Sequence, residues 1–243
     1  FAFFYKSINI IIKNTKLVKY IKEVYMNFNY KLGVIGYGNM ASAICKGIIS
    51  SGVCGISDIF IFDIDEQKII EAKSQGFACS EGVKDIALQC KYIFLSIKPQ
   101  NAGSVFAELS PHINDNIIIS IMAGYLKQNI NKGLNTNKIC RCMPNTPALV
   151  SKGITAIDSS SLSVEERKFV FDIFNSVGGA IEVEEKYMNA VTAVSGSGPA
   201  YVYLFIKHYI NAAKSLGLNQ NQSERLVLST LCGAAEMVKQ GGK

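Results

Sequence analysis

The sequence predicts an α/β protein with a parallel sheet, followed by an all-helical second domain. Three observations support this expectation. A glycine-rich turn joins a short apolar strand to a helix at residues 31–41, strand and helix patterns alternate as far as residue 184, and residues 185–239 contain no clear strand pattern. Parallel strands need crossover connections, so this alternation is typical of a sheet that helices cover on both faces.

The predicted elements follow one another along the first 184 residues. Strands are expected at residues 31–35, 58–62, 91–97, 116–121, 138–143 and 180–183. Helices are expected at residues 39–51, 65–76 and 163–177. The third helix is predicted from Ser163 and Glu166, which have the spacing of a capping box. In such a fold the ligand binds in the loops that follow the carboxyl ends of the strands.

Residues 36–41 have the spacing G-x-G-x-x-A, with Gly36, Gly38 and Ala41 at the three restricted positions. The first glycine permits a sharp turn, the second leaves room for a pyrophosphate, and the alanine keeps the helix close to the sheet. The free N–H groups at the start of the helix favour an anion. The pattern predicts a Rossmann-type dinucleotide site, and its alternative is a tight strand–helix turn without a ligand. The candidate cofactor-binding residues here are Gly36, Tyr37, Gly38, Asn39, Met40 and Ala41.

The predicted organisation has three parts. Residues 1–25 are expected to be a basic extension outside the fold, residues 26–184 the dinucleotide-binding domain, and residues 185–243 a truncated helical domain. Pro199 and the apolar run 201–210 predict a long, well-buried helix, and Ser223 opens another. Helices this apolar beside a small domain favour contact with a second subunit, and the alternative is an ordinary core helix within one chain.

Composition and charge exclude several classes of partner. Hydrophobic residues make up 49% of the chain and charged residues 18%, as in a folded protein. The net charge is +6, but residues 1–25 contain five lysines and one glutamate, which leaves only +2 for the rest. We therefore expect no nucleic-acid partner. The apolar stretch at residues 7–12 is too short to span a bilayer, so no membrane partner is expected either.

The seven cysteines have no C-x-x-C spacing. They are interpreted as buried, reduced thiols of a cytoplasmic protein, and no metal site is expected. Cys140 and Cys142 lie two residues apart in a predicted strand, and we expect their side chains on opposite faces.

Five segments together resemble the pyrroline-5-carboxylate reductase family. They are GYGNMA at 36–41, IKPQ at 97–100, SIMAG at 120–124, RCMPNTP at 141–147 and AVSGSGPAY at 193–201. The resemblance extends over about residues 31–239. It implies NADP- or NAD-dependent reduction of 1-pyrroline-5-carboxylate to L-proline. It also implies a Rossmann domain followed by a helical domain that forms an intertwined homodimer or a higher homo-oligomer.

The resemblance also implies site residues. It places six of them along the cofactor, the last two near the nicotinamide half: Ser96, Ile97, Lys98, Pro99, Met122 and Ala123. It places Glu185 near the substrate and Asn145 in the loop that shapes the floor of the site. No catalytic acid or base is assigned, because hydride transfer to a cyclic imine depends on positioning and electrostatic support.

Three of these segments have plainer alternatives. Lys98 before Pro99 also fits a solvated strand end, and Pro144 and Pro147 fit a turn without a ligand. Ser195 and Ser197 resemble nucleophiles, but no histidine or other base accompanies them in the sequence. We interpret these two serines as a helix N-cap and a turn.

The sequence gives conflicting signals on cofactor choice. Asp63 ends a predicted strand 25 residues after Gly38, where an acid typically binds the ribose 2′-OH of NAD. A 2′-phosphate there would meet the charges of Asp63 and Asp65 without a nearby arginine, while Lys68 lies further along the helix. The family often uses NADPH. The acidic residues after this strand favour NADH over NADPH as the cofactor.

Two other functions remain as alternatives. The 3-hydroxyacid dehydrogenases share this plan but need a catalytic lysine in the helical domain, and Lys207 is a poor match. The other alternative is a non-catalytic dinucleotide-binding fragment. The family continues with a Ser-Pro-Gly-Gly-Thr-Thr loop, which is absent before Lys243. We therefore expect the chain as given to turn over substrate poorly.

Overall fold

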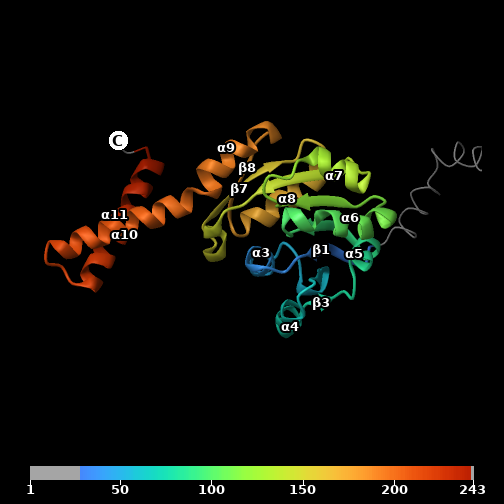
Figure 1. The fold of residues 1–243 in the computed structure, drawn as a ribbon, viewed down its shortest axis with the longest axis horizontal. Coiled ribbons are helices and arrows are strands. Elements are labelled where there is room, and N and C mark those ends of the chain that lie inside the picture. The colour runs from blue at the N-terminus through green and yellow to red at the C-terminus, as the bar shows by residue number, and fades with distance from the viewer. Residues whose placement is uncertain (1–27, 242–243) are drawn as a thin grey trace, which may run out of the picture. The chain divides into compact units, whose positions relative to one another are not determined.

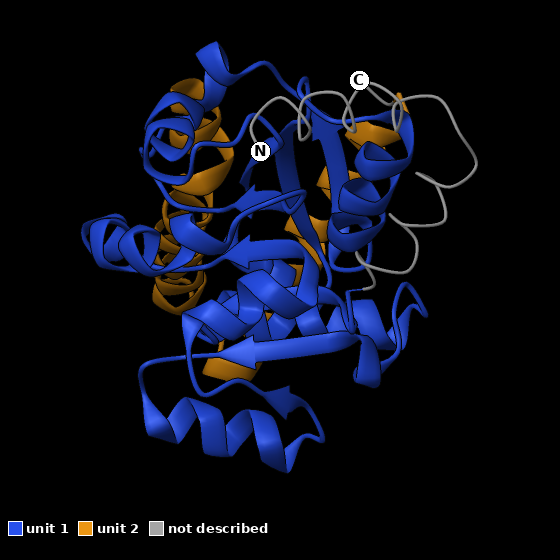
Figure 2. Cartoon of the chain, turned by 90° about the vertical axis from the view of Figure 1, so that its right-hand side faces the viewer, with its two compact units in different colours: residues 1–188 blue, residues 189–243 orange. Residues whose placement is uncertain are grey.

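The computed structural model describes residues 28–241, in two compact units. The sheet unit extends to Met188 and the helical unit starts at Asn189 (Figure 2). The basic extension expected at residues 1–25 lies outside the described residues.

The sheet unit contains an eight-stranded sheet with the order β3-β2-β1-β4-β5-β6-β7-β8 (Figure 1). Its strands are β1 (Tyr30–Ile35), β2 (Ile59–Phe62), β3 (Ala78–Cys79), β4 (Cys90–Leu95), β5 (Ile117–Ser120), β6 (Ile139–Met143), β7 (Gly153–Asp158) and β8 (Gly178–Glu182). The fold class predicted from the sequence is confirmed, since β1 to β6 pair in parallel and helices connect most of them.

One part of the sheet differs from the all-parallel expectation. Strand β7 was not predicted, and it pairs antiparallel to β6, with Arg141 opposite Asp158. The connection between Met143 and Gly153 contains only the short 3-10 helix η4 (Thr146–Val150), which is too short for a parallel crossover. Strand β8 then pairs parallel to β7 after the helix α8.

Six helices accompany the described sheet: α3 (Asn39–Ser50), α4 (Glu66–Ser74), α5 (Val83–Gln89), α6 (Ala102–Leu109), α7 (Lys127–Leu134) and α8 (Val164–Asn175). Alternate residues of β4 point to opposite sides. Tyr92 and Phe94 join the core beneath α3 and α8, whereas Ile93 and Leu95 join the core beneath α5, α6 and α7. Helix α8 begins with the predicted capping box, in which Ser163 and Glu166 each accept the other's backbone N–H.

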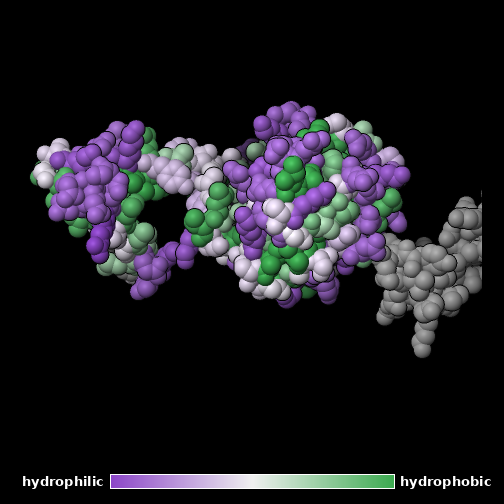
Figure 3. All heavy atoms as spheres, turned by 90° about the horizontal axis from the view of Figure 1, so that it is seen from below, coloured by the Kyte–Doolittle hydropathy of each residue, from purple (hydrophilic) through white to green (hydrophobic). Residues whose placement is uncertain are grey.

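The helical unit contains the end of α9 (Met188–Val191), a π-helix (Thr192–Gly196), α10 (Gly198–Ser215) and α11 (Gln220–Lys239). Helices α10 and α11 pack against each other. The expectation of a well-buried helix is wrong for the single chain, because Tyr201, Leu204 and Phe205 are each more than half exposed. Apolar side chains are visible on the surface of this unit (Figure 3). No helix among residues 28–241 has the length and hydropathy needed to cross a membrane.

The close packing of α3 on α8 generates a stability prediction. A Cβ on Gly47 of α3 would lie 2.4 Å from Val177 Cγ1 and 3.0 Å from Ser176 O. Gly47→Ala should therefore lower the free energy of unfolding by about 1–3 kcal/mol, as overpacking does. Gly103→Ala in α6 is the matched control, because no atom lies within 4 Å of its Cβ position. It should leave stability unchanged or raise it by up to about 1 kcal/mol. Urea unfolding of both variants tests the packing, and equal stabilities would contradict it.

Candidate functional site

The strand order reverses between β1 and β4. The chain leaves β1 toward β2 and β3, and then returns to the other side of β1 to form β4, β5 and β6. In parallel sheets, ligands bind outside the carboxyl ends of the strands at such a switch point. Backbone hydrogen bonds join the loops at this edge. Gly36 N–H donates to Phe62 O at 2.8 Å, Ser96 N–H to Ile35 O at 2.9 Å, and Ile121 N–H to Leu95 O at 3.1 Å.

The glycine turn fits a diphosphate. Gly36 has φ +93°, and a Cβ there would lie 2.5 Å from Ser96 O, so a side chain is excluded. No atom lies within 4 Å of the Cβ position of Gly38, which occupies the N-cap of α3. No side chain caps this helix and no acid lies in its first turn, while its first intrahelical bond is from Ser42 N–H to Gly38 O. The N–H groups of residues 39–41 are therefore suited to an anion.

Within this turn, Tyr37 and Ala41 point away from the open side. Ala41 is fully buried in the core. The Tyr37 ring is also fully buried, packs edge-on to Phe77, and its hydroxyl donates to Gln75 Oε1 at 3.0 Å. Burial raises the pKa of Tyr37 to about 12. Only the backbone of Tyr37 lies at the turn, and its N–H donates to Asp63 Oδ2 at 2.5 Å. Asn39 is exposed and Met40 half-buried.

The loops after β4 and β5 lie at the same edge. Ser96 and Ile97 are half-buried, whereas Lys98 and Pro99 are exposed at the start of a short 3-10 helix. After β5 the Met122 side chain is buried in the core, and Ala123 is exposed. The topology thus brings the glycine turn, Asp63 and these two loops together from four separate segments of the chain.

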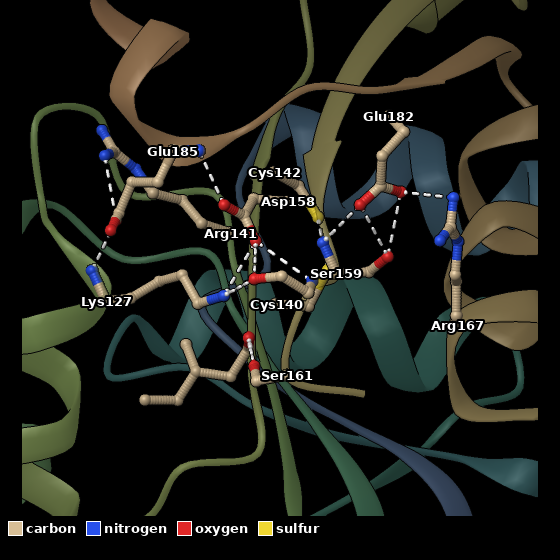
Figure 4. A network of polar contacts seen from close by, with 12 residues as sticks. Lys127, Cys140, Arg141, Cys142, Asp158, Ser159, Ser161, Arg167, Glu182 and Glu185 are labelled. Atoms are coloured by element: carbon tan, nitrogen blue, oxygen red, sulfur yellow. Dashed lines mark hydrogen bonds and ion pairs between the residues drawn. The ribbon is translucent and has the colours of Figure 1, made fainter. Parts of the chain in front are cut away.

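Glu185 belongs to a network of charged side chains at β6 and β7 (Figure 4). Its Oε1 accepts the backbone N–H of Lys127 at 2.7 Å and Arg141 Nη1 at 3.2 Å. Its own N–H donates to Asp158 Oδ2 at 2.6 Å, while Asp158 Oδ1 accepts Lys127 Nζ at 2.8 Å. Arg141 is 3% exposed. No local sequence pattern indicates this network, because its hydrogen-bonded members lie 27–58 positions apart along the chain.

Hydrogen bonds determine the charge state of Asp158. Burial by itself would raise its pKa, but the hydrogen bonds from Lys127 and Ser160 outweigh burial and hold the pKa at about 2. The carboxylate therefore remains ionised over the whole range in which most proteins are folded.

Asn145 lies at the start of η4 and is 9% exposed. Its Oδ1 accepts the N–H of Ile154 at 2.9 Å, which fixes the start of β7 beside the loop that follows β6. In the helical unit, Ser195 Oγ donates to Val191 O at 3.1 Å. Ser197 occupies the N-cap of α10 without a side-chain cap bond. Among residues 28–241 no three metal-ligating side chains form a cluster.

The expectation for Cys140 and Cys142 is wrong. Their Sγ atoms lie 3.6 Å apart, in the same buried core. Side chains alternate along a strand with a period of two, so residues two apart share a face.

The position of Asp158 generates a prediction on acid stability. Its folded-state pKa of about 2 lies below the ordinary value of 3.8, so its stabilisation is present above pH 4 and is lost as pH falls toward 2. Asp158→Asn should lower the free energy of unfolding by at least about 2 kcal/mol at pH 7. The difference in the free energy of unfolding between this variant and the wild type should narrow below pH 4. Asp115→Asn, which breaks an exposed pair with Lys138, should cost less than about 1 kcal/mol. Urea unfolding at several pH values gives both differences, and a pH-independent difference would contradict the assignment.

Comparisons with known proteins identify the family. A family model described as pyrroline-5-carboxylate reductase dimerisation matches residues 185–243. A second, described as NADP oxidoreductase coenzyme F420-dependent, matches residues 31–124. A pyrroline-5-carboxylate reductase from Staphylococcus epidermidis is 35% identical over 214 residues, which cover 86% of this chain and 79% of the relative.

Solved structures agree with these relatives. The Plasmodium falciparum pyrroline carboxylate reductase with NADP bound has a TM-score of 0.78 and 35% identity, over 88% of this chain and 80% of that one. A pyrroline-5-carboxylate reductase from Coxiella burnetii has a TM-score of 0.82 and 30% identity, over 87% and 80%. The glycine turn, the sheet and the helical unit are therefore parts of a known architecture, and the chain belongs to the pyrroline-5-carboxylate reductase family.

Proposed function

We propose that this protein is an oxidoreductase that reduces 1-pyrroline-5-carboxylate to L-proline with NADPH or NADH, the last step of proline biosynthesis. The observation that carries the proposal is the open glycine turn at the β1–β4 switch point in a member of this family. Substrate and product are small molecules, and we infer neither a nucleic-acid nor a membrane partner. Seven cysteines without a disulfide support a cytoplasmic location.

The residues at the carboxyl edge supply binding and orientation. When bound, the reduced nicotinamide cofactor supplies the hydride. We assign its diphosphate to the turn from Gly36 to Ala41 and its adenosine ribose to Asp63. The loop from Ser96 to Pro99 would line its middle, with Met122 and Ala123 near the nicotinamide. The uncapped start of α3 and the open space at Gly38 support the first of these assignments.

Glu185 and Asn145 are our candidates on the substrate side. The imine nitrogen of the substrate must be protonated, because a cationic nitrogen makes the ring carbon a better hydride acceptor. The N–H of this protonated imine in turn needs a hydrogen-bond acceptor in the site. Glu185 Oε1 is held by Lys127 and Arg141, while its Oε2 accepts no hydrogen bond from another described residue. That oxygen can accept the imine N–H. Asn145 shapes the floor through its bond to Ile154. No step in this mechanism needs a strong side-chain base.

The apolar surface of the helical unit supports a homodimer or a higher homo-oligomer. A groove of about 580 Å³ between α10 and α11 is lined by Tyr201, Val202, Phe205, Ile206, Leu228, Leu231, Cys232 and Ala235. The large apolar side chains of residues 201–205 on α10 are each more than half exposed. Contiguous exposed apolar residues mark interaction sites, and these residues lie within the match to the dimerisation model. We assign this groove to contact with a second copy of the chain.

The nucleotide turn gives the experiment that tests the proposal. Gly38→Val places a branched side chain where the diphosphate must approach the backbone, yet φ is −72° and no neighbouring atom lies within 4 Å. The variant should fold normally and lose NADH and NADPH binding on the order of 100-fold, or about 2.7 kcal/mol. Fluorescence titration and turnover of pyrroline-carboxylate measure the two effects. Gly103→Ala serves as the control with unchanged binding. Normal cofactor binding by Gly38→Val would show that the turn is not the site.

The groove assignment predicts a change in oligomeric state. Phe205→Glu or Leu228→Glu would bury a charge in the proposed contact and should weaken self-association at least tenfold, or about 1.4 kcal/mol. Asn211→Glu, which is exposed on α10 outside the groove lining, should leave the oligomer intact. Sedimentation velocity at several concentrations distinguishes the species. The assignment is wrong if both groove variants sediment as the wild type does.

A further inference from the structure

We infer that Asp63 makes the adenosine end of this site selective for NAD(H) over NADP(H). The inference rests on the proposed dinucleotide site and goes beyond it, because the related enzyme from Plasmodium falciparum was solved with NADP bound. That structure shows which cofactor the relative binds, and we argue the preference of this chain from its own residues after β2.

The Asp63 carboxylate is fixed between two loops. Its Oδ2 accepts Tyr37 N–H from the glycine turn at 2.5 Å, and its Oδ1 accepts Asp65 N–H at 2.9 Å. A carboxylate has about four acceptor positions, so sites remain for the hydroxyls of a ribose. The two backbone bonds set the orientation of the group in advance, beside the turn that binds the diphosphate. A ribose 2′-OH can donate to this carboxylate, as in NAD-specific sheets of this kind.

Residues 62–67, which extend from the end of β2 into the first turn of α4, contain no lysine or arginine to bind a 2′-phosphate at the same place. Such a phosphate would bring nearly two negative charges. Asp65 and Glu66, both exposed, follow Asp63 directly, and Asp65 already caps α4 by accepting Gln67 N–H at 2.9 Å. Lys68 is the nearest cation along this segment, and its Nζ is ion-paired with Glu71 Oε2 at 2.7 Å. The charge around the β2 loop is therefore repulsive toward NADP(H) but not toward NAD(H).

Ile64 provides a second contact that does not discriminate. Its side chain is 90% exposed, between two acids at the carboxyl end of β2. An apolar side chain in this position can cover the face of an adenine ring, which both cofactors share. Ile64 should therefore contribute to the affinity for both cofactors equally, whereas Asp63 contributes to the difference between them.

The test compares the two cofactors by fluorescence titration and by turnover. The wild type should bind NADH at least tenfold more tightly than NADPH. Asp63→Asn removes the charge and one of the two N–H acceptors, so NADH affinity should fall, NADPH affinity should rise, and the ratio should shift at least tenfold. Ile64→Ser should weaken both cofactors by the same factor. Asp115 lies just before the amino-terminal end of β5, whereas the site lies at the carboxyl ends of the strands. Asp115→Asn makes the same change in net charge there and should leave the ratio of the two affinities unchanged.

A second variant covers the case in which Asp63→Asn does not fold. Asp65→Asn with Glu66→Gln removes two charges and preserves the α4 cap, because asparagine caps helices as well as aspartate does. This variant should raise NADPH affinity and leave NADH affinity within twofold. A wild-type preference for NADPH with normal turnover would overturn the inference alone. Failure of the wild type to bind either cofactor would overturn the proposed function, and the inference with it.

Discussion

The turn at Gly36 is the constraint on which the nucleotide edge depends. A Cβ at this position would lie 2.5 Å from Ser96 O, so β1 and the continuation of β4 can approach only where the chain has no side chain. That approach lets Ser96 N–H bond to Ile35 O and Gly36 N–H bond to Phe62 O. The ends of three neighbouring strands are joined in this way. Asp63 then meets Tyr37 N–H as a consequence of strand register rather than of any local sequence signal.

The charged network at β6 and β7 depends on a different balance. Arg141 and Asp158 are almost fully buried, and removing two charges from water costs several kcal/mol per ion unless the pairing is good. Here each ion has a close partner, and the bonds join the start of α7, the strands β6 and β7, and the segment at Glu185. Well-packed apolar residues could give similar stability. Apolar residues could not donate hydrogen bonds to Glu185 Oε1, as Lys127 and Arg141 do. The network therefore fixes the orientation of the Glu185 carboxylate.

The sequence was most informative where the determining interactions are local. All six predicted strands and the capped helix at Ser163 overlap observed elements, because periodicity and caps act within a few residues. The glycine turn is local for the same reason. Strand β3 has two residues and carries no usable pattern, and the network around Arg141 joins residues up to 58 positions apart. The error at Cys140 and Cys142 has another origin, since the period of a strand already places both on one face.

The helical unit marks a limit of hydrophobic pattern as a guide to burial. Apolar positions on α10 predict a buried helix, and the same positions are exposed in the single chain. The transfer free energy of an apolar side chain depends on the area removed from water, not on which chain removes it. The residues of the sheet unit bury one another, so there the pattern and the single-chain structure agree. In α10 and α11 the same pattern indicates burial against a second chain, so there it predicts contact with a partner and not burial within one chain.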